Sequence, residues 1–312
     1  MSGGAQSLTA GQNPRGGATF DYWFRTAPRG TVKLELRDGN GKVIRTYSSD
    51  SLPNDSIRTS ADSIARRMRE SMRDSVVYEP ADSIVPARAG TNRFVWNLRY
   101  PGAKQLKNTL IDEGTLAGPV APPGTYSVRL IVGRDTLARQ FTLDADPRVK
   151  TSTEELVRQF ALASNVRDRI TDVVDGATRI EDIQEQLDKR VAQSKDNASA
   201  SRVADAVKPL REKLEAIRAE LYEVGCHVDQ CSLDQPVRLY NMLITMNSQV
   251  QTGDYGPTKQ HGEMFADFSS KVGDQLRKLQ ALEDADLVAI NKLLTELQLP
   301  VIYVPPRKAT TM

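Results

Sequence analysis

Apolar and polar residues alternate with a period of two along the first half of the chain. Phe94, Trp96 and Leu98 are separated by Val95 and a polar residue, which is typical of a β-strand with one face on a core. Trp96 is the largest apolar side chain of this region, so we expect neighbouring strands to pack around it. The same alternation predicts further strands at about residues 19–24, 32–37, 42–47, 124–132 and 136–143.

Turn residues separate these segments. Asn40-Gly41 follows the segment at 32–37, and this pair supplies the positive φ angles that a tight hairpin needs. About six strands joined by hairpin turns and proline-rich connections are typical of a small antiparallel sandwich. We therefore predict an immunoglobulin-like antiparallel β-sandwich over residues 13–147.

Two stretches do not follow this alternation. Residues 1–12 are rich in glycine, serine and alanine, so we predict a disordered N-terminus. Residues 48–89 break the pattern between two strands, and we predict a mobile insertion there, because long loops cost little closure entropy. Within the insertion, residues 61–75 can form one amphipathic helix.

The period of the apolar residues changes from 2 to 3.6 after Pro147. Thr151 and Glu154 predict a capping box, and the stripe that follows predicts a helix over about residues 153–192. A heptad seam predicts a second helix, in which Pro209 should cause a kink or a late start. The seam consists of Val203, Val207, Leu210, Leu214, Ile217, Leu221 and Val224.

Shorter apolar stripes predict three more helices, near residues 239–250, 257–279 and 287–297. Such helices cannot bury their stripes alone, so we predict an antiparallel α-helical bundle over residues 148–300. Residues 301–312 end in polar positions and are predicted to be a loose tail. The predicted fold class is therefore α+β and multidomain, with the sandwich followed by the bundle.

Charge is nearly balanced, with 42 Lys and Arg against 40 Asp and Glu and a net charge of +2. This balance argues against a nucleic-acid partner, which normally meets a clear basic excess. No apolar run reaches the length of a membrane span. The first residues lack the basic and apolar regions of a signal peptide. We expect either a cytoplasmic protein or the tail of a longer chain whose export signal lies upstream.

The chain has two cysteines, Cys226 and Cys231, with His227 and Asp229 between them. A local disulfide is the first interpretation, conditional on an oxidising compartment. Two free thiols and a zinc site are the alternatives, although zinc needs four ligands and the other histidine, His261, is distant in sequence. We assign no metal site.

The sequence contains none of the motifs for a nucleophile elbow, a zinc protease, a phosphate loop or a dinucleotide site. We therefore assign no catalytic residue and no cofactor. Asp112 and Glu113 are interpreted as solvated loop carboxylates rather than as a glycosidase pair, which must flank a substrate. Trp23 points away from Phe20 and Tyr22 in the predicted strand, which makes it the candidate ligand-binding residue, with a sugar as the ligand.

Six stretches of the chain occur in a recognisable order: residues 13–22, 41–46, 90–102, 122–126, 146–149 and 234–241. Together they resemble the C-terminal region of large bacterial sortilin-like β-propeller proteins with BNR repeats, which are often labelled glycosyl hydrolases. The resemblance covers about residues 13 to 300.

The resemblance implies a non-catalytic accessory or scaffold module that packs against a β-propeller domain, located upstream or in a separate chain. It also implies a secreted or periplasmic protein, with a possible protein partner on the helical bundle. The Asp-box repeats of the family are absent, so no catalytic residue is carried over. The alternatives are a glycan-acting hydrolase component and a coiled-coil protein that self-assembles through residues 203–224.

Overall fold

The computed structural model describes residues 16–50, 83–107, 109, 111, 113–194, 200–223, 233 and 235–306. The chain divides into two compact units. The β unit comprises Met1–Pro101 and Val120–Asp146. The helical unit comprises Gly102–Pro119 and Pro147–Met312. A segment predicted to belong to the sandwich, Gly102–Pro119, is thus part of the helical unit.

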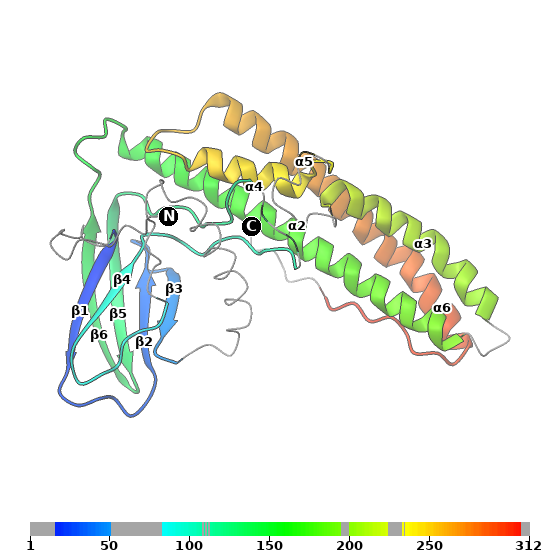
Figure 1. Ribbon diagram of the computed structural model, residues 1–312, viewed down its shortest axis with the longest axis horizontal. Coiled ribbons are helices and arrows are strands. Elements are labelled where there is room, and N and C mark those ends of the chain that lie inside the picture. Colours follow the sequence, from blue (N-terminus) through cyan, green and yellow to red (C-terminus); the bar gives the residue numbers. More distant parts are fainter. Residues whose placement is uncertain are drawn as a thin grey trace, which may run out of the picture. The chain divides into compact units, whose positions relative to one another are not determined.

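The β unit contains two antiparallel sheets (Figure 1). One sheet pairs β1 with β4, and the other has the strand order β3-β2-β5-β6. The strands are β1 Ala18–Phe24, β2 Val32–Arg37, β3 Val43–Ser48, β4 Gly90–Trp96, β5 Gly124–Val132 and β6 Asp135–Leu143. The predicted strand positions therefore agree with the structure to within a few residues.

Side chains from both sheets form one apolar cluster in the β unit. Trp96 of β4 is fully buried in it, and its ring lies 5.9 Å from that of Tyr126 on β5. Phe141 of β6 completes the aromatic group, with its ring centroid 6.3 Å from that of Trp96. The expectation that neighbouring strands pack around Trp96 is confirmed.

The strand that carries Trp96 ends earlier than its alternation predicted. Leu98 has a φ of 60°, which no extended strand adopts, so β4 ends at Trp96. The Trp96 indole N–H donates to the carbonyl of Arg99 at 3.0 Å, which satisfies this polar atom within the turn.

Part of the predicted insertion is ordered in the β unit. Ser48 and Ile84 form a parallel bridge, and the next residue, Val85, is buried in the apolar cluster. The predicted helix at 61–75 and the predicted disordered residues 1–12 lie outside the described residues.

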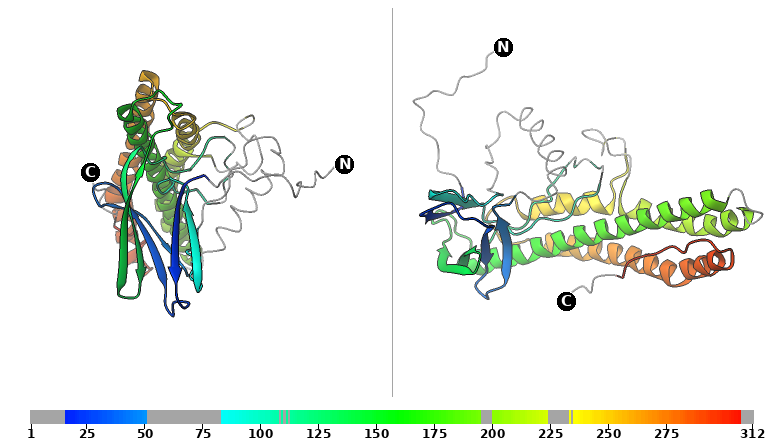
Figure 2. Two further views of the ribbon diagram at one scale, coloured as in Figure 1. Left: turned by 90° about the vertical axis from the view of Figure 1, so that its left-hand side faces the viewer. Right: turned by 90° about the horizontal axis from the view of Figure 1, so that it is seen from below.

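The helical unit is organised along α2, Thr153–Ser194, a helix of 42 residues. Helix α3 lies along the C-terminal half of α2, and α4 lies along its N-terminal half (Figure 1). Helix α5 also packs on α2, and Figure 2 shows it continuing into α6. The remaining elements are α3 Ala200–Leu221, α4 Leu239–Val250, α5 Lys259–Leu282, the π-helical turn η2 Glu283–Leu287 and α6 Val288–Glu296.

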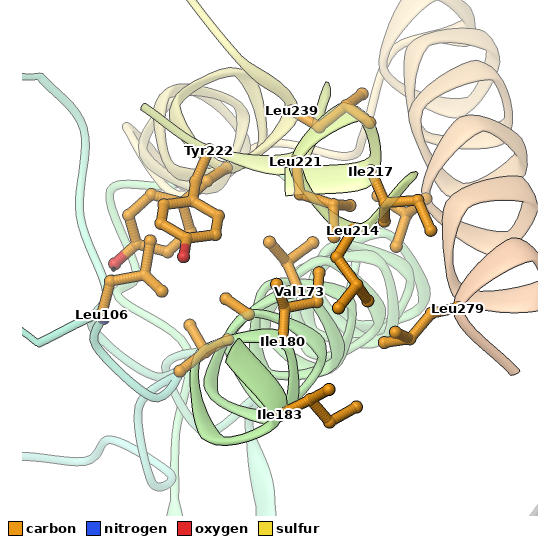
Figure 3. Packing of buried hydrophobic residues seen from close by; sticks show 14 of the residues in the cluster. Leu106, Val173, Ile180, Ile183, Leu214, Ile217, Leu221, Tyr222, Leu239 and Leu279 are labelled. Atoms are coloured by element: carbon orange, nitrogen blue, oxygen red, sulfur yellow. Dashed lines mark hydrogen bonds between the residues drawn. The ribbon is translucent and has the colours of Figure 1, made fainter. Parts of the chain in front are cut away.

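One apolar cluster fills the helical unit. Figure 3 shows Val173, Ile180 and Ile183 of α2 and Leu214, Ile217 and Leu221 of α3 among the side chains of this cluster. The described part of the predicted heptad seam, Val203 to Leu221, is buried in this cluster. Because these side chains pack inside the chain, the seam serves its own fold.

Two local helix features differ from the prediction. The capping box at the start of α2 consists of Ser152 and Glu155, one residue later than predicted: Glu155 N–H donates to Ser152 Oγ at 3.2 Å, and Ser152 N–H donates to Glu155 Oε2 at 3.1 Å. Pro209 lies inside α3, which begins at Ala200, so the late start is wrong.

Candidate functional site

Trp23 lies on β1 with 64% of its surface exposed. It is paired with Thr91 of β4, and its ring is on the face of the two-stranded sheet that points away from the apolar cluster. Asp21 and Arg93 are paired across the same two strands, at positions that share this face because they lie two residues away. The candidate site is therefore an exposed aromatic ring beside a charged pair.

The charged pair beside Trp23 has fixed geometry. Arg93 Nε donates to Asp21 Oδ1 at 2.7 Å, and Nη2 donates to Oδ2 at 2.9 Å. These hydrogen bonds lower the pKa of the Asp21 carboxyl group. The pair therefore presents a carboxylate and a guanidinium, joined by two hydrogen bonds, on the same face of the sheet as the indole.

The other residues singled out in the sequence do not form a site with Trp23. Glu113 is exposed on the segment that belongs to the helical unit, whereas Asp112 lies outside the described residues. Cys226, His227 and Cys231 also lie outside the described residues, so their disulfide stays a prediction. Among the described residues, no group of three or more His, Cys, Asp or Glu side chains could hold a metal ion.

Polar side chains of the helical unit hold the segment Gly102–Pro119, a role that the sequence did not predict. Asn247 of α4 is fully buried, and its amide donates to the carbonyls of Thr115 at 2.8 Å and Ala117 at 3.1 Å. Its own carbonyl oxygen accepts from Gln251 at 2.8 Å. Every polar atom of the buried Asn247 amide group thus fixes either the segment or a neighbouring side chain.

Two other contacts hold the first part of this segment. Leu106 is buried in the apolar cluster near Tyr222 (Figure 3), and its N–H donates to the Tyr240 hydroxyl at 3.3 Å. Lys104 forms an ion pair of 2.5 Å with Asp175 of α2. Burial raises the pKa of the Tyr240 hydroxyl, which therefore stays neutral and available as an acceptor.

Gly114 lets the same segment approach α4 closely. Its φ is +88°, and a Cβ atom built there would lie 2.5 Å from the carbonyl carbon and oxygen of Ile244. Thr115 N–H donates to that carbonyl oxygen at 3.3 Å. Only glycine combines this backbone conformation with this distance.

A groove of about 660 Å³ lies on the helical unit between α4 and α5. Apolar Met242 and Ala281 alternate in its lining with charged residues. Lys271 pairs with Asp267 at 2.7 Å, and Arg277 pairs with Asp274. Because Lys271 and Arg277 are each paired with a carboxylate of α5, these two side chains do not give the groove a strong positive charge.

The end of α6 leads into an extended segment that is held on the helical unit. Ile302 is 3% exposed, and its backbone bonds to the Asn291 side chain in both directions. Gln186 of α2 makes the same pair of bonds to Tyr303. The predicted loose tail therefore does not apply to residues 301–306, while residues 307–312 lie outside the described residues.

Sequence reasoning missed these anchoring residues because each acts on a distant part of the chain. Asn247 lies in the apolar stripe of its helix, between the buried Met246 and Val250, and a polar residue at such a position is the available signal. A buried polar residue needs hydrogen-bond partners, but the amino-acid sequence does not show which backbone groups provide them.

Family models, curated proteins and solved structures were compared with the chain, and none of them matches it. In the part of the chain that the structure describes, no helix is both long enough and apolar enough to cross a membrane.

Proposed function

We propose that this chain is a non-catalytic accessory module that packs with a sortilin-like β-propeller. The resemblance of the six ordered stretches to the C-terminal region of such proteins is the basis for naming the propeller. The proposed architecture is an immunoglobulin-like β-sandwich and an antiparallel helical bundle. The shared apolar cluster of the two sheets supports the sandwich, and the packing of α3, α4 and α5 on α2 supports the bundle.

The use of buried polar groups is the observation that carries the non-catalytic part of the proposal. Asn247 holds the carbonyls of Thr115 and Ala117. Buried Asn92 in the same way bonds to the backbone of Arg88 in both directions. Buried Glu283 pairs with Arg179 at 2.5 Å, and Arg179 in turn donates to the backbone carbonyl of Pro305 at 2.7 Å. Polar groups that fix the backbone in this way act as structural supports, whereas catalytic groups converge on an accessible cleft.

Two experiments test this proposal. The coding sequence upstream of Met1, with its neighbouring genes, tests the association with a propeller: we expect BNR repeats in an open frame or in an adjacent gene, and their absence from both contradicts it. A panel of glycans tests the non-catalytic role. We expect no turnover by the purified chain, and turnover that disappears in Glu113→Gln would instead support a glycan-acting hydrolase.

A glycan-contact surface at Trp23 is the second candidate function. An exposed indole can stack on the apolar face of a sugar ring, and the adjacent Asp21–Arg93 pair offers an acceptor and donors for hydroxyl groups. Glycan titration followed by tryptophan fluorescence tests this role, because the other tryptophan, Trp96, is buried. Trp23→Ala should abolish the change and Trp23→Phe should retain part of it; a change that persists in Trp23→Ala excludes the site.

Self-assembly through the α3 seam has less support, because the described seam residues pack inside the chain. We expect a monomer at micromolar concentration in analytical ultracentrifugation. A dimer that is lost on polar substitution of the seam, in a chain that still folds, would favour the coiled-coil alternative.

A further inference from the structure

The segment after α6 is held by side chains rather than by a neighbouring strand. Asn291 Nδ2 donates to the Ile302 carbonyl at 3.0 Å, and Ile302 N–H donates to Asn291 Oδ1 at 2.7 Å. Gln186 Nε2 donates to the Tyr303 carbonyl at 2.9 Å, and Tyr303 N–H donates to Gln186 Oε1 at 2.9 Å. Two carboxamides, one from α6 and one from α2, thus bind the backbone as a paired strand would.

The side chains of this segment alternate between the helical unit and solvent. Ile302 is 3% exposed, and Val304 packs partly buried against the same apolar cluster. By contrast, Val301, which precedes Ile302, is 48% exposed, and Tyr303, between Ile302 and Val304, is 68% exposed. Proteins that bind extended peptides use the same two features. Hydrogen bonds to the peptide backbone provide affinity, and pockets for every second side chain provide specificity.

Arg179 of α2 binds the far end of the segment. Its Nη1 donates to the carbonyl of Pro305 at 2.7 Å, and its Nε and Nη2 donate to buried Glu283 at 2.5 and 2.8 Å. Glu283 opens the π-helical turn η2, a type of helix irregularity that is frequent at functional sites. The segment therefore completes the hydrogen bonding of an ion pair that also fixes the junction between α5 and α6.

The connection from α6 to the segment is a closed helix end. Gln298 has a φ of 56°, and the N–H groups of Gln298 and Leu299 donate to the carbonyls of Thr295 and Leu294, so the backbone hydrogen bonds of α6 end before the segment begins. In the described part of the chain, residues 301–305 have no backbone-to-backbone hydrogen bond. Figure 1 shows this segment, coloured red, running back along α2 after α6.

We infer that the surface of α2 and α6 on which residues 301–305 lie is a binding site for an extended peptide, and that these residues occupy it as an exchangeable internal ligand. The external ligand is an extended peptide with apolar side chains at two positions separated by one residue, as Ile302 and Val304 are in the segment. Its backbone N–H and carbonyl groups must be free to bond at the first of these positions and at the residue that follows it, as in Ile302 and Tyr303. Such a peptide, offered by a partner protein, displaces the chain's own segment. This inference does not depend on the proposed accessory role.

A labelled peptide with the sequence of residues 299–306 tests the inference by fluorescence anisotropy. The full chain with Ile302→Asp, which empties the site, should bind the peptide at least tenfold more tightly than the unaltered chain does. Adding Asn291→Ala should weaken this binding at least tenfold, whereas the matched control Gln193→Ala, an exposed amide on α2, should leave it unchanged. A peptide with Asp in place of Ile302 should not bind.

Equal binding to the unaltered chain and Ile302→Asp, or binding that Asn291→Ala does not weaken, overturns the inference. Absence of binding to folded Ile302→Asp, checked by circular dichroism, does so as well. If that variant does not fold, the inference is tested on the unaltered chain by NMR. Excess unlabelled peptide should shift the signals of the Ile302 and Tyr303 amides in an isotope-labelled chain. Unshifted signals at saturating peptide overturn the inference.

Discussion

Asn247 donates its side-chain amide to the carbonyl of Thr115 at 2.8 Å, across 132 positions of the sequence. Asn247 is fully buried on α4, and Thr115 lies on a segment between two β-strands that belongs to the helical unit. The helical unit is therefore completed by residues that precede β5 in the chain. Buried polar side chains stabilise this arrangement.

Replacing Asn247 with Ala should destabilise the helical unit by about 2 kcal/mol, because the carbonyls of Thr115 and Ala117 lose their donor in a buried place. Urea unfolding followed by circular dichroism measures the loss. The control is Gln249→Ala, an exposed residue of the same helix, which should change the unfolding free energy by no more than about 0.5 kcal/mol. Equal effects of the two substitutions would contradict the role of Asn247.

Two glycines should respond to Ala in opposite directions. Gly114→Ala places a Cβ atom 2.5 Å from the Ile244 carbonyl at a φ of +88°, so it should lower the unfolding free energy by at least about 2 kcal/mol. Gly262→Ala meets no atom within 4 Å inside α5, and it should raise the unfolding free energy by about 0.5–1 kcal/mol through helix propensity. Thermal melting of the two variants checks the sign of each change.

The buried ion pair between Arg179 and Glu283 should be costly to break. Glu283→Ala leaves the guanidinium without its bidentate partner, and we expect a loss of about 3–5 kcal/mol in unfolding free energy. The control is Glu263→Ala, which removes an exposed partner of Lys259 and should cost less than about 1 kcal/mol. A loss below 1 kcal/mol in Glu283→Ala would show that the pair is not an important support.

Stability should fall at alkaline pH, partly through Tyr222. Burial raises the pKa of Tyr222 above its ordinary value of 10.0, and the hydrogen bond to Glu181 raises it further. The folded state thus favours the neutral phenol. The stabilisation that the neutral Tyr222 phenol gives the folded state is fully present below pH 10. It is lost as the pH rises from there through the higher pKa of Tyr222 in the folded state.

Urea unfolding of the unaltered chain and Tyr222→Phe between pH 8 and pH 11 tests this expectation. The unaltered chain should be more stable at pH 8 by about 1 kcal/mol, because the variant lacks the hydrogen bond to Glu181. The difference should narrow above pH 10, where the unfolded unaltered chain ionises Tyr222. A difference that stays constant across this range would contradict the assigned cause.

Local patterns predicted the elements of this fold well. Asn40-Gly41 correctly placed the β2–β3 hairpin, although only Gly41 has the predicted positive φ, at +80°, and Asn40 does not. Gly41 N–H donates to the carbonyl of Asp38 at 2.9 Å. Apolar residues at helical spacing, such as Ile170 and Leu187, correctly predicted the buried stripe of α2. These features depend on residues close together in sequence, which is why period and turn chemistry are sufficient to find them.

Long-range attachments could not be predicted in this way. Gly102–Pro119 shows no period of 2 or 3.6, and its position depends on Asn247 and Tyr240, more than a hundred residues away. The segment at 301–306 is extended, but the carboxamides that bind it are on α2 and α6. Of the candidate site, the exposure of Trp23 followed from alternation, whereas its charged neighbours Asp21 and Arg93 required the strand register.

The central claim is that Gly102–Pro119 is a structural part of the helical unit. Native-state hydrogen exchange of the full chain tests it most directly at the amides of Leu106 and Thr115, which donate to Tyr240 and Ile244. Leu210→Ala, in the helical core, should speed exchange at both amides, and Leu34→Ala, in the β core, should leave it unchanged. Faster exchange in Leu34→Ala but not in Leu210→Ala would contradict the claim.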